Sequence, residues 1–124
     1  MRLASRLAVA FALALAATAA TPQTVKLLVQ SSPLAGFRYH DASLVWHELK
    51  VGDGLALVRE PSNPHDANAV RVEWSGRKLG YVPRSQNEAL AWAMDRGEAV
   101  SARISRLQEH RNPRLRLEFE VFVD

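Results

Sequence analysis

The sequence contains no cysteine, which excludes disulfide bonds, zinc–thiolate sites and thiol chemistry. It also lacks a glycine-rich phosphate-binding loop and the Gly-x-Ser-x-Gly motif of a nucleophile elbow. No histidine has a second histidine four residues away, the spacing that binds zinc on a helix. We therefore expect no catalytic residue, no metal and no cofactor. A triad assembled from distant Ser, His and Asp leaves no such signature, so a hydrolase stays as a disfavoured alternative.

The chain also has little net charge. Lysine and arginine number 16 against 13 acidic residues, and two of the arginines lie in the first 23 residues, where there is no acid. Without that segment the balance falls to 14 against 13, because 16 minus 2 leaves 14. Net charge therefore does not indicate a polyanionic partner, and only the distribution of charge could do so. A chain of 124 residues has room for one domain.

The first 20 residues have the order of a secretory signal peptide. Arg2 and Arg6 precede an uncharged run, and Ala17 and Ala19 have the A-x-A spacing of a cleavage site. The 14 uncharged residues 7–20 are fewer than the roughly 20 that span a bilayer. We expect cleavage near Ala19 or Ala20, a periplasmic or secreted protein, and no stable membrane anchor after processing. A retained anchor and a mitochondrial presequence are the alternatives, and the mass of the mature chain distinguishes them.

Strands are predicted over 24–31, 55–60, 69–74, 79–83, 99–108 and 115–123. The first is rich in β-forming residues between Pro22 and Pro33, the fourth is the return strand of a hairpin, and apolar residues alternate in strands such as 55–60, 99–108 and 115–123. The segment GFRYHD (36–41) suggests a short strand or a strand edge. Residues 43–49 allow one or two helical turns capped by Ser43. The fold class is therefore β-rich α+β, a small β-barrel of about six strands with one main helix, over residues 24–124.

The main helix is predicted over 85–97. Ser85 and Glu88 have the spacing of a capping box, and Gly97 is placed to end the helix in a left-handed conformation. The predicted buried stripe consists of Ala89, Leu90, Ala93 and Met94.

The stretch EPSNPHDANAVRV (60–72) allows two interpretations. As a turn, Asn63-Pro64 starts it and Asp66 accepts hydrogen bonds from backbone N–H groups further along. As a site, His65 and Asp66 face outward beside an anion or a hydroxyl group. The two interpretations are compatible, because a rigid turn is a suitable place to hold a carboxylate.

The segment LALVREPSNPHDANAVRVEWSGRKLGYVPRSQNEALA resembles the HIRAN domain. The shared features are R-E-P-x-N-P-x-D-x-x-A-V, then L-G-Y-[LV]-P, then a helix that begins with polar residues. With GFRYH upstream, the resemblance covers about residues 34–97, and the last two strands more loosely. It implies an OB-like or SH3-like barrel with helical additions, here in a free-standing, exported bacterial member.

The resemblance implies binding of the 3′ end of single-stranded DNA. An aromatic ring would stack on the terminal base, a carboxylate would accept the terminal hydroxyl, and arginines would hold flanking phosphates. Carried over position by position, the pocket residues are Arg38, Tyr39, His65, Asp66, Tyr81 and Arg84. Tyr39 is the expected stacking platform, Asp66 the hydroxyl acceptor, and His65 a smaller ring than the family's usual tyrosine.

The resulting prediction is a non-enzymatic binding module whose partner is a nucleic-acid 3′ end or another ligand with hydroxyl and phosphate groups. The alternative is an exported interaction or structural domain that binds a sugar, nucleotide or protein and has no DNA role. No segment supplies the helicase, ATP or zinc motifs of longer relatives, and the oligomeric state stays open. One further set is ambiguous, either a basic binding face or an ordinary solvated surface: Arg103, Arg106, Arg111, Arg114 and Arg116.

Overall fold

The structure, a computed structural model, describes residues 25–124, so the predicted signal peptide lies outside it. Within these residues the strands are β1 Leu27–Pro33, β2 Gly54–Arg59, β3 Val70–Trp74, β4 Arg77–Tyr81, β5 Val100–Leu107 and β6 Leu117–Val123. The α-helices are α1 Ala42–Val45 and α2 Glu88–Asp95, and the 3-10 helices are η1 Phe37–Tyr39, η2 Trp46–Glu48, η3 Arg84–Gln86 and η4 Pro113–Leu115. None of the helices in this part of the chain has the length and apolar character to cross a membrane.

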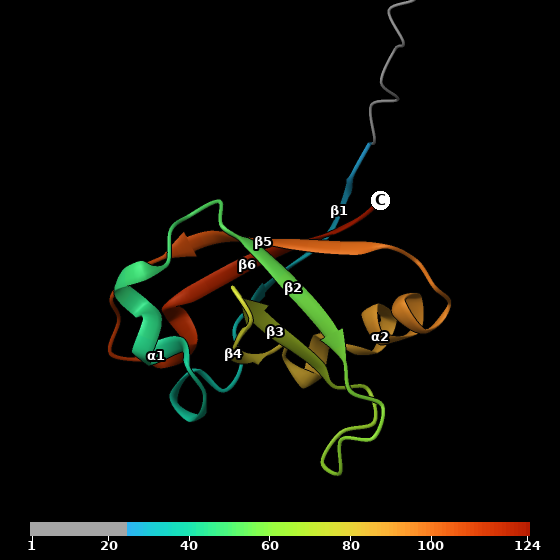
Figure 1. Ribbon diagram of the computed structural model, residues 1–124, viewed down its shortest axis with the longest axis horizontal. Helices are drawn as coiled ribbons and strands as arrows, with labels where there is room; N and C mark the ends of the chain where they lie inside the picture. Colours follow the sequence, from blue (N-terminus) through green and yellow to red (C-terminus); the bar gives the residue numbers. More distant parts are fainter. Residues whose placement is uncertain (1–24) are drawn as a thin grey trace, which may run out of the picture.

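The strands form one bent antiparallel sheet in the order β1-β6-β5-β2-β3-β4. Its two ends meet just beyond β1, where Ala35 and Tyr81 exchange two backbone hydrogen bonds of 2.9 Å. This pair closes the sheet into a barrel. In Figure 1, α1 and α2 lie at opposite ends of the barrel. The predicted β-rich α+β fold is confirmed.

The core follows the alternation of the strands. Leu117, Phe119 and Val121 in β6 are buried, and the glutamates between them face outward. Those glutamates meet arginines of β5 across the strand pair: Arg106 lies 3.1 Å from Glu118, and Arg103 lies 3.8 Å from Glu120. Two of the five ambiguous arginines therefore belong to an ordinary outer surface of ion pairs.

The prediction of a strand at GFRYHD is wrong. Gly36 has φ 78°, and the Tyr39 N–H donates to the Gly36 carbonyl at 3.0 Å, so the chain turns into the 3-10 helix η1. Phe37 points into the core with 3% of its surface exposed, whereas Tyr39 is 83% exposed. A period-two pattern over so few residues does not distinguish a strand from one helical turn.

The predicted helix caps are also wrong. Ser85 lies in η3, one turn before α2, and Asn87 is the N-cap residue of α2. At α1 it is Asp41, not Ser43, that occupies the N-cap position. The buried residues of α2 are Leu90, Ala91 and Ala93, whereas the predicted Ala89 is exposed and Met94 is partly buried. The end of the helix at a left-handed Gly97, with φ 85°, is confirmed.

Gly80 lies where the barrel closes, and we expect Gly80→Ala to destabilise the fold. A Cβ atom there would come 2.2 Å from the Ala35 carbonyl oxygen, which accepts one of the two closing hydrogen bonds. Overpacking of this kind costs about 1–3 kcal/mol, measurable by urea unfolding. Gly54→Ala is the matched control, because nothing lies within 4 Å of a Cβ at Gly54. Equal stability of the two variants would contradict this account of barrel closure.

Candidate functional site

The closing pair places η1 on the surface beside β4. From η1, Arg38 and Tyr39 project outward while Phe37 anchors the turn in the core. Gly36 is required here twice over, because its φ is positive and a Cβ would lie 3.2 Å from the His40 ring. The site therefore begins with an exposed tyrosine and arginine on a rigid turn.

The turn between β2 and β3 faces η1 across the end of β4. The Asn63 side chain accepts a hydrogen bond from His65 N at 2.9 Å, and Asp66 Oδ1 accepts one from Asn68 N at 2.9 Å. These two Asx turns are the structural role that the sequence predicts for this segment. They hold His65 and Asp66 in fixed positions.

Asp66 is tied to the segment before α2 as well. Its Oδ2 accepts a hydrogen bond from Asn87 Nδ2 at 2.7 Å and lies 3.7 Å from Arg84 Nε. Arg84 also donates to the His65 carbonyl. Desolvation raises the pKa of Asp66, but the hydrogen bonds from Asn68 and Asn87, together with Arg84, outweigh it and hold the pKa below 3.8. The carboxylate is therefore ionised at neutral pH.

These elements enclose a cavity of about 710 Å³, which we call the end cavity. Five of the six predicted pocket residues line it: Tyr39, His65, Asp66, Tyr81 and Arg84. Arg38 does not, because it points to the other side of η1, into a neighbouring cavity of about 320 Å³ that Tyr39 also lines. Asp66 has an amide donor on each oxygen, yet 21% of its side chain is exposed and it shares the end cavity with Tyr39.

Sequence reasoning missed His40 and Lys78, which line the end cavity, and Glu60, which lines a neighbouring cavity and contacts Tyr81. Tyr81 donates its hydroxyl to Glu60 at 2.8 Å, Lys78 Nζ lies 4.5 Å from the centre of the Tyr81 ring, and His40 meets that ring edge-on at 5.5 Å. Burial and then Lys78 lower the pKa of His40, more than Asp41 and Glu60 raise it. The pKa of Glu60 is lowered overall. Desolvation raises it, but the hydrogen bonds from Tyr81, Asn63 and Arg71 outweigh that effect.

The sequence contained a signal that could have identified some of the residues that sequence reasoning missed. His40 directly follows the GFRY segment, and Lys78 precedes the L-G-Y motif. The sequence contained no such signal for Asn87. It lies between Ser85 and Glu88, which have the spacing of a capping box, and its hydrogen-bond partner Asp66 is 21 residues away. Among residues 25–124, no three His, Asp or Glu side chains come together as a metal site.

Comparison with known proteins gives a consistent result. A family profile described as the HIRAN domain matches residues 27–124. A Fanconi-associated nuclease 1 homolog from Oryza sativa subsp. japonica is 33% identical over an alignment of 92 residues, and the match covers 64% of this chain and 9% of that protein. The rabbit (Oryctolagus cuniculus) helicase-like transcription factor is 36% identical over 63 residues, which are 50% of this chain and 6% of that protein. The chain thus spans less than a tenth of the length of these curated relatives.

Two crystal structures share the fold. A protein from Lactobacillus plantarum superposes with a TM-score of 0.70 at 29% identity, covering 80% of this chain and 95% of that one. The HIRAN domain of human HLTF superposes with a TM-score of 0.61 at 22% identity, covering 76% of this chain and 73% of that one.

The lowered pKa of Asp66 gives a pH-dependent stability. A carboxyl group whose pKa is depressed by folding stabilises the fold above its ordinary pKa, and the contribution is lost as the pH falls through the depressed value. We expect Asp66→Asn to cost about 1–3 kcal/mol near pH 7, because hydrogen bonds to a charged acceptor are lost. The difference from the wild type should shrink below pH 3.8, the ordinary value. Urea unfolding at several pH values measures it.

Asp95→Asn is the control, since this carboxylate is 50% exposed in its ion pair with Arg59. Its effect should stay below about 1 kcal/mol. A cost of Asp66→Asn that is the same at pH 7 and at pH 3 would show that the charge of Asp66 is not what stabilises the turn.

Proposed function

The chain belongs to the HIRAN domain family, and on that basis we propose that residues 24–124 form a non-enzymatic module that binds the 3′ end of a single-stranded nucleic acid. The proposal is carried by one observation. Asp66 is the one carboxylate among the described side chains that line the end cavity, and it lies there among an exposed tyrosine and basic groups.

Tyr39 supplies the stacking surface. Its side chain is 83% exposed at the rim of the end cavity, so the ring is free to cover a base. Stacking of a base on an aromatic side chain contributes about 1–3 kcal/mol and is tolerant of sequence, because every base has a π face. His65, on the turn opposite, is the smaller second ring.

The cations are placed to bind phosphate. Lys78 and Arg84 line the end cavity, and Arg38 lies on the far side of η1 from it. A strand that enters over η1 would meet Arg38 before its last base reaches Tyr39. Contacts of this kind are independent of sequence and weaken with salt.

Asp66 explains a preference for an end. An ionised carboxylate repels phosphate, so an internal nucleotide is unfavourable beside it, whereas a terminal hydroxyl can donate to it. A carboxylate has about four acceptor positions, and two are taken by Asn68 and Asn87. The structural role of Asp66 in the turn is thus compatible with a third donor from the ligand.

The acid–base properties of the site favour binding over catalysis. A general acid or base works best with a pKa near the operating pH. The pKa values of Asp66 and Glu60 are both lowered by their hydrogen-bond donors, which keeps them as permanent acceptors at neutral pH.

A carbohydrate is the second candidate. An aromatic face beside a carboxylate suits a sugar as well, and the leader-like residues 1–20 would take the domain to a compartment poor in single-stranded DNA. This candidate predicts that a disaccharide displaces a labelled oligonucleotide from the end cavity.

We expect a fluorescent oligonucleotide with a free 3′-OH to bind about tenfold more tightly than the same strand with a 3′-phosphate, measured by anisotropy. Asp66→Asn should remove most of this preference, since a hydrogen bond to a charged group contributes about 1.5–3 kcal/mol. Tyr39→Ala should weaken both strands about equally, and Trp92→Ala, a 55% exposed aromatic on α2, should change neither. Equal affinity of the wild type for the two strands would contradict recognition of a 3′ end.

A further inference from the structure

The positive charges of the domain are unevenly paired. Of the Lys and Arg residues between 25 and 124, eight take part in ion pairs: Lys26, Arg59, Arg71, Arg77, Arg84, Arg96, Arg103 and Arg106. The others in this range have no carboxylate within 4.0 Å: Arg38, Lys50, Lys78, Arg111, Arg114 and Arg116. All of these except Lys50 line one of three cavities around η1.

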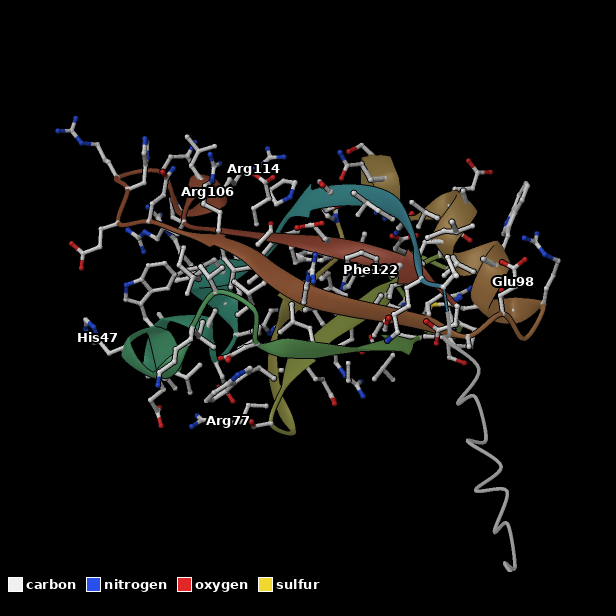
Figure 2. The ribbon with its side chains drawn as sticks, turned by 90° about the horizontal axis from the view of Figure 1, so that it is seen from above. His47, Arg77, Glu98, Arg106, Arg114 and Phe122 are labelled. Carbon is white, nitrogen blue, oxygen red and sulfur yellow. The ribbon has the colours of Figure 1, made fainter. Side chains whose placement is uncertain are left out.

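The three cavities follow one another along η1. The end cavity and the next one, the middle cavity, share Tyr39, and Arg38 and Arg114 line the middle cavity. The middle cavity and a third, which we call the tryptophan cavity, share Phe37. Figure 2 shows His47 at one end of the molecule and Glu98, which follows α2, toward the other, with Arg114 between them.

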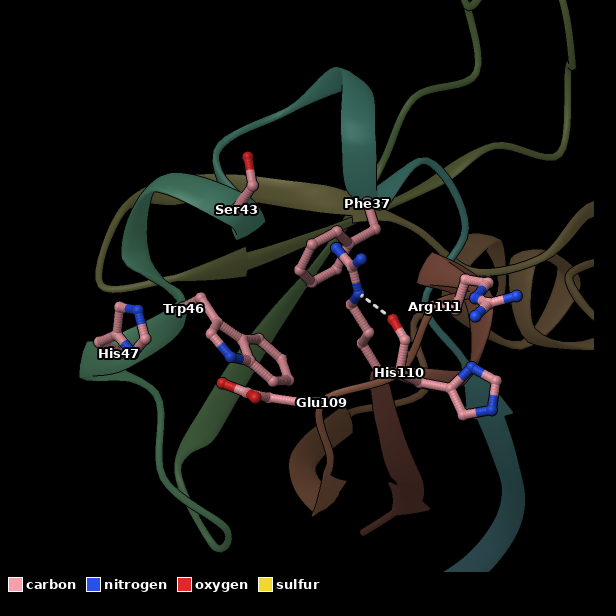
Figure 3. Close-up of a pocket in the computed structure, with 8 residues that line it drawn as sticks. Phe37, Ser43, Trp46, His47, Glu109, His110 and Arg111 are labelled. Atoms are coloured by element: carbon pink, nitrogen blue, oxygen red, sulfur yellow. Dashed lines mark hydrogen bonds between the residues drawn. The ribbon is translucent and has the colours of Figure 1, made fainter.

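The tryptophan cavity has a volume of about 530 Å³ and lies between the α1–η2 segment and the loop that joins β5 to β6 (Figure 3). Trp46 meets the buried Phe37 ring edge-on, with centroids 5.6 Å apart and planes at 75°. The Arg116 guanidinium lies 5.2 Å from the Phe37 ring, and its Nε donates to the His110 carbonyl at 2.7 Å. The floor of the cavity is therefore aromatic, and its Phe37 ring contacts both Trp46 and Arg116.

The rim determines what this cavity can hold. Arg111 and His110 lie on the loop side, and Glu109 lines the cavity together with Trp46. A carboxylate beside the indole disfavours a phosphate at that spot but can accept a hydrogen bond from a base amino group. A base over Trp46 with its phosphates toward Arg111 and Arg114 satisfies both conditions.

We propose that the tryptophan cavity is a second base-binding subsite for the same strand. The strand has its 3′ nucleotide in the end cavity, passes Arg38 and Arg114 in the middle cavity, and places a base of an upstream nucleotide against Trp46. This inference rests on the proposed function and extends it, because it assigns the unpaired arginines of the β5–β6 loop to phosphates beyond the terminal nucleotide.

The test compares two lengths of single-stranded DNA with a free 3′-OH, a dinucleotide and an octanucleotide, by anisotropy or calorimetry. The octanucleotide should bind more tightly to the wild type. Trp46→Leu, which keeps apolar volume in the cavity floor, should weaken the octanucleotide about fivefold or more and leave the dinucleotide unchanged. Trp92→Leu on α2 is the matched control and should affect neither length.

The arginines are tested through salt dependence. Each phosphate contact on a single strand contributes about 0.7 to the slope of log K against log salt, so Arg111→Gln with Arg114→Gln should reduce the octanucleotide slope by about 1.4. The paired arginines of the sheet surface, changed together as Arg103→Gln with Arg106→Gln, should leave it unchanged.

The outcomes separate the two claims. If both lengths bind the wild type equally, or if Trp46→Leu weakens them by the same factor, the second subsite does not exist and the end cavity stands alone. If neither length binds at moderate salt, the proposed function itself is wrong and the subsite with it.

Discussion

One backbone pair determines where the functional residues lie. Ala35 and Tyr81 hydrogen-bond to each other across the ends of the sheet, and they approach this closely because Gly80 has no side chain. The pair turns an open sheet into a barrel and leaves η1 beside β4, so that Tyr39 faces the Asp66 turn and Phe37 faces Trp46. The end cavity and the tryptophan cavity thus lie on two sides of one short segment, and both depend on its placement.

Asp66 combines a structural and a functional role. Its hydrogen bonds to Asn68 and Asn87 join the β2–β3 turn to the start of α2, and the same bonds keep it ionised. Asp66 is only partly buried, so its hydrogen bonds offset a modest desolvation cost, whereas removing the donors would leave a carboxylate without partners. Fixing the carboxylate in this way also prepares it for a ligand hydroxyl, since no rearrangement is needed when the ligand arrives.

Sequence patterns predicted the parts of the fold that depend on periodic burial. The sequence predicted the alternating burial in β3, β5 and β6 and the left-handed Gly97 after α2. The family motif also identified five residues that line the end cavity. Two of the errors involve long-range contacts. Asn87, the N-cap residue of α2, has its hydrogen-bond partner Asp66 in a distant turn, and β4 pairs with Ala35, just before the turn at GFRYHD. Local residue spacing encodes neither contact. Of the five arginines that the sequence left ambiguous, Arg103 and Arg106 pair with glutamates of β6 on the outer face of the sheet. The sequence alone did not reveal these cross-strand ion pairs.

The central claim is that a nucleic-acid strand occupies the η1 side of the barrel. An NMR titration of the isotope-labelled protein with a single-stranded oligonucleotide carrying a free 3′-OH tests it most directly. The account predicts saturable amide shifts in η1, in the turn that contains Asp66 and in the β5–β6 loop, with little change in α2. Shifts confined to α2 or to the outer face of β5 and β6, with η1 unaffected, would contradict it.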